Sequence, residues 1–64
     1  MARGLLITWF GGREFGFIQP DDGGPDVLVH ARDFISQPHE GQSYEFKLLP
    51  DRNRRSGYRA EKIK

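Results

Sequence analysis

Two aromatic residues that alternate along one short segment offer the clearest candidate chemistry in this sequence. Phe15 and Phe17 are separated by one glycine, and His30 ends a second short apolar run. Successive side chains of a β-strand point to opposite faces, so Phe15 and Phe17 share a face, as do Leu28 and His30. Rings exposed side by side on strands form an apolar patch that a soluble monomer normally avoids. The first hypothesis is therefore an interaction surface.

The direction in which these rings point depends on which side of each strand is buried. The β-branched residues of the two runs suit a core: Ile18, Val27 and Val29. Burying them turns both phenylalanines outward, together with Leu28 and His30. The opposite assignment, with the phenylalanines buried and Ile18 outside, fits the alternation about equally well. Gly16 favours the outward rings, because a strand glycine lets another backbone or a ligand approach closely.

The elements that must position these side chains are short. The 8 glycines and 4 prolines divide the chain into pieces without helical periodicity, and the intervening runs read as strands. Within the longest connection, residues 31–41, Ala31–Ile35 could form one helical turn. In the fourth strand, Tyr44, Phe46 and Leu48 are expected in the core. The expected strands are Leu5–Phe10, Phe15–Gln19, Val27–His30, Gln42–Leu49 and Tyr58–Ile63.

The length and the absence of cysteine bound the architecture. A chain of 64 residues predicts a single domain, residues 1–64, and no disulfide or thiolate zinc site can stabilise it. Five short strands then predict an all-β barrel of OB-fold or SH3-like type, since closing a sheet removes exposed edges. Two histidines cannot complete a structural metal site, so no metal or other cofactor is expected.

The chain also lacks membrane and export signals. No apolar run approaches the ~20 residues of a membrane span, and no signal-peptide pattern opens the sequence. We therefore expect a cytoplasmic monomer without membrane contact by this segment.

The net charge of +1 conceals an uneven distribution. Residues 14–45 carry one base and seven acids, whereas residues 47–64 carry seven bases and two acids. A polyanion responds to the local field, so the basic end could serve a nucleic acid. A solvated, charge-balanced surface is the alternative. Most of the bases fall in the Arg-rich loop 50–57 and the last strand: Arg52, Arg54, Arg55, Arg59, Lys62 and Lys64.

Catalysis is not expected from this sequence. No nucleophile and base occur in a recognisable catalytic context, and Asp21-Asp22 reads as a turn. His30, Asp26 and Asp33 could meet near one sheet edge, but no further metal ligands can be placed beside them. We therefore expect a protein that is not an enzyme and has no small-molecule substrate.

Taken together, these motifs resemble the cold-shock domain family from Gly4 to Ile63. Trp9-Phe10 resembles the family's Trp-Phe pair, and Phe-Gly-Phe-Ile from residue 15 resembles the core of its first RNA-binding motif. Asp-Val-Leu-Val-His, ending at His30, is similar to the second motif. Glu40-Gly41-Gln42 and the segment 57–60 are similar to the family's lead into its fourth and fifth strands. The resemblance implies a five-stranded antiparallel OB-fold barrel that binds single-stranded RNA or DNA, with an RNA-chaperone-like action.

The resemblance also implies a set of nucleic-acid-binding residues, and this chain departs from the family at several of its positions. Thr8 replaces a lysine, Glu14 brings an anion to the binding face, and Ala31 stands where a ring is usual. The loop after His30 is shorter and lacks its aromatic residue. Each missing stacking residue should cost ~1 kcal/mol of binding free energy. These losses predict a dissociation constant nearer micromolar than nanomolar. The expected binding residues are Trp9, Phe10, Arg13, Phe15, Phe17, Leu28, His30 and Arg59.

Two other interpretations stay open. A protein-interaction barrel of SH3 or Tudor type also uses exposed aromatic side chains, although its rings lie in loops that grip a peptide. The short loop around Pro38 and the basic last strand are also similar to a divergent cold-shock branch. In that branch, the domain precedes a membrane-embedded region. The chain could then be the N-terminal soluble module of a longer membrane protein, with weak nucleic-acid binding.

Overall fold

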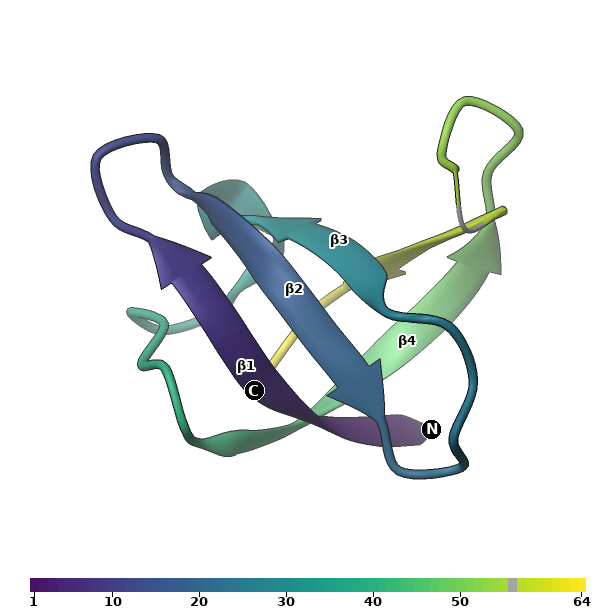
Figure 1. Ribbon diagram of the computed structural model, residues 1–64, viewed down its shortest axis with the longest axis horizontal. Coiled ribbons are helices and arrows are strands. Elements are labelled where there is room, and N and C mark those ends of the chain that lie inside the picture. Colours follow the sequence, from purple (N-terminus) through teal and green to yellow (C-terminus); the bar gives the residue numbers. More distant parts are fainter. Residues whose placement is uncertain (56) are drawn as a thin grey trace.

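Five strands and a short 3-10 helix make up the regular structure of the computed structural model, which describes residues 1–55 and 57–64. The strands pair antiparallel in the order β3-β2-β1-β4-β5 and curve into a barrel (Figure 1). No helix in the described part of the chain has the length and apolar character needed to cross a membrane. The all-β prediction is confirmed, and the strand order is consistent with an OB-fold. The elements are β1 (Ala2–Phe10), β2 (Phe15–Pro20), β3 (Val27–His30), η1 (Ala31–Asp33), β4 (Ser43–Pro50) and β5 (Tyr58–Glu61).

A seam between residues 34–35 and residues 63–64 closes the barrel. Phe34 and Ile63 form a parallel bridge, and the Ile35 amide donates to the Ile63 carbonyl at 2.9 Å. Lys64 and Glu45 exchange two backbone hydrogen bonds of 2.8 and 2.9 Å, which fasten the end of the chain to β4. The seam therefore pairs backbone groups that the β3 and β5 ends would otherwise leave open.

The core confirms the predicted facing of β2 and β3. Ile18, Val27 and Val29 are at most 2% exposed, and they pack with other inward residues from every strand. One core prediction was wrong, because Leu48 is 37% exposed. Its position on β4 does alternate inward, opposite the buried Ala60, but it lies at an open end of the barrel. The core cluster is Leu6, Ile18, Val27, Val29, Phe34, Tyr44, Phe46, Ala60 and Ile63.

Several element boundaries differ from those expected. β1 begins at Ala2 rather than Leu5, because its first residues pair with β4. β5 ends at Glu61 because Lys62 adopts a left-handed φ of 52°, which interrupts an extended strand. The helical turn is shorter than expected and stops at Asp33. Of the Arg-rich loop 50–57, Ser56 lies outside the described residues.

A β-bulge at Ile7 reverses the alternation along β1. The pairing with β2 shifts between Leu6 and Thr8, so the residues after the bulge face opposite to a simple alternation. The Glu40 carboxylate accepts a 2.8 Å hydrogen bond from the Trp9 amide just beyond the bulge. Gly41 donates to the Leu6 carbonyl at 2.8 Å just before it. The segment that leads into β4 therefore holds β1 on both sides of the bulge.

Candidate functional site

The outer face of β1, β2 and β3 gathers five of the predicted site residues. Phe15 pairs with Phe10 on one side and with His30 on the other, and Phe17 pairs with Leu28. Residues paired across antiparallel strands share a face, so these five side chains lie together. We call this surface, made of Phe10, Phe15, Phe17, Leu28 and His30, the aromatic face.

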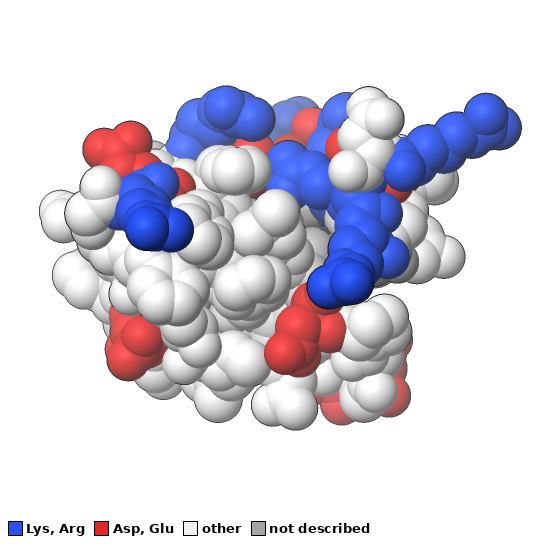
Figure 2. All heavy atoms as spheres, turned by 45° about the horizontal axis from the view of Figure 1, so that its top comes forward, with Lys and Arg blue, Asp and Glu red and all other residues white. Residues whose placement is uncertain are grey.

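The rings of the aromatic face support one another and stay partly open to solvent. The Phe10 and Phe15 centroids are 5.0 Å apart, and those of Phe15 and Phe17 are 6.2 Å apart in an edge-to-face arrangement. Phe10 is 45% exposed, and the other four residues are half-buried. Figure 2 shows a broad uncharged surface with Lys and Arg side chains gathered along its upper and right-hand margin. An exposed apolar patch with a polar border is typical of an interaction site.

The structure confirms the prediction, made from a glycine within a strand, that another group approaches closely at Gly16. A Cβ at this position would lie 2.2 Å from the Thr8 carbonyl oxygen and 2.7 Å from Cε3 of Trp9. The approaching group is therefore the β1 backbone and the indole ring. This contact fixes β1 against β2 beneath the aromatic face.

Trp9 is not part of the aromatic face. The bulge places it on the inner side, opposite Gly16, where its half-buried ring meets Phe34 edge to face at 5.6 Å between centroids. It packs against the core at the barrel rim. Simple alternation misses this, because one inserted residue inverts every side chain that follows it. A nucleic-acid-binding role for Trp9 stays a prediction.

Arg59 is held by acidic neighbours rather than placed on the aromatic face. Its guanidinium nitrogens lie 3.9 Å from a carboxylate oxygen of Asp51 and 4.0 Å from one of Glu61. Arg54 instead reaches β3, where its Nη1 donates to the Leu28 carbonyl at 3.4 Å. Arg54 also pairs with Asp51 at 3.6 Å. The sequence contains no signal for this contact beyond the position of Arg54 in a basic loop.

His30 lies where β3 meets η1, in an environment that disfavours its charged form. Its amide donates to the Asp33 carboxylate at 2.9 Å. Burial lowers the pKa of His30 below its ordinary value of 6.5, and the nearby positive charges of Arg54 and Arg32 lower it further, against the opposing effect of Asp33. A neutral imidazole at pH 7 suits stacking on a base.

We expect this pKa shift to appear in the pH dependence of stability. A histidine whose pKa is lower in the folded chain takes up protons preferentially when unfolded. The stability contributed by neutral His30 is therefore complete above pH 6.5 and is lost as the pH falls through the folded pKa. Urea denaturation above and below this pH should show that acidification lowers the free energy of unfolding less in His30→Gln than in the parent chain. An NMR titration midpoint at or above 6.5 for the His30 ring would contradict the shift.

Arg13 lies at the end of the aromatic face where β1 turns into β2. It is exposed in the turn 11–14, beside Glu14, which adopts a left-handed φ of 56°. The Glu14 carbonyl accepts a 2.9 Å hydrogen bond from Ala31, so this turn is fastened to the start of η1. The structure thus brings Arg13 to the neighbourhood of His30, with which it lines one small hollow.

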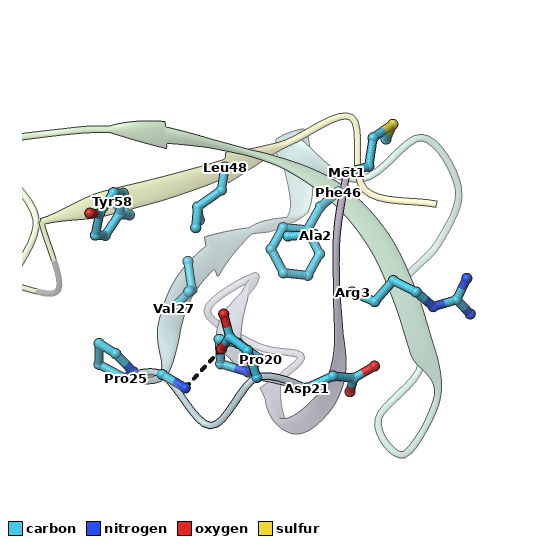
Figure 3. Close-up of a pocket in the computed structure, with 12 residues that line it drawn as sticks. Met1, Ala2, Arg3, Pro20, Asp21, Pro25, Val27, Phe46, Leu48 and Tyr58 are labelled. Atoms are coloured by element: carbon cyan, nitrogen blue, oxygen red, sulfur yellow. Dashed lines mark hydrogen bonds between the residues drawn. The ribbon is translucent and has the colours of Figure 1, made fainter.

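An apolar cleft of about 500 Å³ opens at the opposite end of the barrel (Figure 3). In Figure 3, Leu48 points across this cleft toward Val27, which explains why a residue that alternates inward stays exposed. Tyr58 and Pro25 also line the cleft. None of the eight predicted site residues contributes to its lining.

The fold and the aromatic face define a small OB-type barrel with an exposed aromatic surface, and comparison with known proteins gives its family. Residues 3–64 match the family model of the 'Cold-shock' DNA-binding domain. The chain is 42% identical over 57 residues to the probable cold shock protein y4cH of Sinorhizobium fredii, covering 81% of each chain. It is 42% identical over 50 residues to cold shock protein CspA of Rhizobium meliloti, covering 70% of this chain and 72% of the relative.

A longer plant protein is also similar. Glycine-rich protein 2 of Nicotiana sylvestris is 40% identical over 52 residues, which cover 73% of this chain and 24% of that protein. The chain therefore belongs to the cold-shock domain family, which is a nucleic-acid-binding rather than an enzymatic family.

Proposed function

We propose that this protein binds single-stranded RNA or DNA by stacking unpaired bases on the aromatic face. The observation that supports this most directly is the contiguous, partly exposed set of rings at Phe10, Phe15 and Phe17, with neutral His30 beside them. Every base has a π-face, so such stacking is sequence-tolerant and contributes ~1–3 kcal/mol per base. Basic side chains at the margin add contacts to phosphates, which makes the affinity fall with salt.

An RNA-chaperone-like action follows from this mode of binding. A protein that binds unpaired strands stabilises the open state of a nucleic acid by mass action, without an active site. Because several stacking positions carry small or aliphatic residues, such as Leu28 and Ala31, we expect a micromolar dissociation constant. Weak, exchangeable binding is compatible with transient opening of structured RNA. We also propose that the protein acts as a cytoplasmic monomer.

A titration of the ¹⁵N-labelled protein with hexathymidylate at low salt tests the proposed function. Chemical-shift changes are expected at the aromatic face, whereas the cleft around Leu48 should not respond. The control is a long, thermally stable blunt-ended duplex, whose paired bases cannot stack on the rings. Absence of shifts at saturating single strand, or shifts concentrated at Leu48 and Tyr58, would contradict the proposal.

A further inference from the structure

A small polar hollow lies beside the aromatic face, at the end where His30 is found. It has a volume of about 240 Å³ and is formed by the turn 11–14 and the start of η1. Two contacts hold these segments together, the Ala31-to-Glu14 backbone hydrogen bond of 2.9 Å and the Phe15–His30 pairing. The hollow therefore continues the aromatic face directly. Its lining residues are Arg13, Glu14, His30, Ala31 and Arg32.

The two arginines of this hollow are not neutralised within the described residues. Arg13 and Arg32 are both exposed, and neither takes part in an ion pair with the residues 1–55 and 57–64. By contrast, Arg3, Arg54 and Arg59 each lie within 4.0 Å of a carboxylate oxygen. Unpaired cations beside an apolar surface disfavour self-association of the protein but favour the binding of a polyanion.

The lining of the hollow carries two arginines against one glutamate, so its formal charge is positive. Burial lowers the pKa of His30, the positive charges of Arg54 and Arg32 lower it further, and the negative charge of Asp33 opposes them. The carboxylate of Asp33 accepts a hydrogen bond from the His30 amide, so part of its charge is already compensated. Glu14 is the remaining anion in the lining. A guanidinium fork suits the tetrahedral oxygens of phosphate, with which it forms paired charge-assisted hydrogen bonds.

We propose that Arg13 and Arg32 hold one backbone phosphate of a strand whose bases stack on the aromatic face. This inference rests on the proposed function and adds to it a fixed position for the strand. Stacking alone tolerates sliding, because rings of this kind accept any base. A phosphate held at one end of the face sets the register of the nucleotides along β1, β2 and β3.

The salt dependence of binding distinguishes this contact from stacking. For hexathymidylate with hydroxyl ends, Arg32→Ala should lower the slope of log affinity against log salt by about 0.7, the value for one phosphate contact on a single strand. Affinity at low salt should fall about tenfold. Lys47→Ala is the matched control, because Lys47 is an exposed cation that lines a different hollow with Met1 and Lys62. That variant should keep the parent slope.

Neutral methylphosphonate linkages locate the phosphate. Placed at each position of the oligonucleotide in turn, one linkage should weaken binding to the parent protein, and the same linkage should cost less in Arg32→Ala, where Arg13 alone is left to hold the phosphate. Glu14→Gln removes the anion and keeps a side chain of similar size at the left-handed position, so it should tighten binding. Equal slopes in the parent and Arg32→Ala, with hexathymidylate still bound at the aromatic face, would overturn the phosphate site alone. Failure of the oligonucleotide to bind at all would overturn the proposed function.

Discussion

Replacement of Phe17 by alanine is expected to weaken the binding of single-stranded oligonucleotides by about ten- to a hundredfold while the domain stays folded. Phe17 lies on β2, the middle strand of the aromatic face, between its pairing partners on β1 and β3. Removing it deletes a stacking platform and also the edge-to-face support of Phe15, 6.2 Å away. Fluorescence anisotropy of a labelled oligonucleotide, together with urea denaturation, measures both effects.

A second phenylalanine provides the contrast for this experiment. Phe46 is fully buried, and Phe46→Ala should cost about 3–5 kcal/mol of unfolding free energy, enough to unfold much of so small a domain. Phe17 is only half-buried on the outer face, so its truncation should cost clearly less. A loss of stability in Phe17→Ala equal to that in Phe46→Ala would place the ring in the core. Unchanged affinity in a folded Phe17→Ala would remove the aromatic face from the proposed function.

Replacement of Gly16 by alanine is expected to destabilise the fold by about 3 kcal/mol, at the upper end of overpacking effects. The added methyl group would lie 2.2 Å from the Thr8 carbonyl oxygen, which is a backbone atom that cannot rotate away. β1 and β2 would have to separate at the centre of the sheet. Thermal or urea denaturation measures the loss directly.

Gly12 offers a matched control for this substitution. A Cβ at Gly12 meets nothing within 4 Å, and its φ is not in the left-handed region. Gly12→Ala should therefore be neutral or slightly stabilising, by about 0.4–1 kcal/mol through the unfolded chain. Equal stabilities of the two alanine variants would show that β1 does not approach β2 as closely as the structure places it.

Much of the fold, and the direction in which the rings of the candidate site face, can be predicted from local sequence patterns. The alternation of side chains and the breaks at glycine and proline predict five strands, because both signals depend only on neighbouring residues. Burial of Ile18 and Val29 then turns Phe15 and Phe17 outward, and the structure confirms this facing. The choice between the two possible facings needed the family resemblance, since alternation is symmetric.

The features that sequence reasoning missed all depend on distant contacts. The bulge at Ile7 is stabilised by Glu40, more than thirty residues further along the chain, and no pattern within β1 marks it. Leu48 alternates inward correctly, but its exposure depends on where the barrel opens. The contact of Arg54 with Leu28 likewise joins a loop to a strand 26 residues away. Local periodicity carries no information about such contacts.

The seam that closes the barrel also separates a part of the molecule with local strand connections from a part joined by long-range contacts. The aromatic face is built from the two consecutive pairs β1–β2 and β2–β3, whose turns are short, so little chain entropy is lost in forming them. Closure at Phe34 and Ile63 joins residues about thirty positions apart and becomes favourable only after most of the chain is ordered. The aromatic face thus belongs to the locally connected half, and we expect the long-range closure at Phe34 and Ile63 to limit the rate of folding.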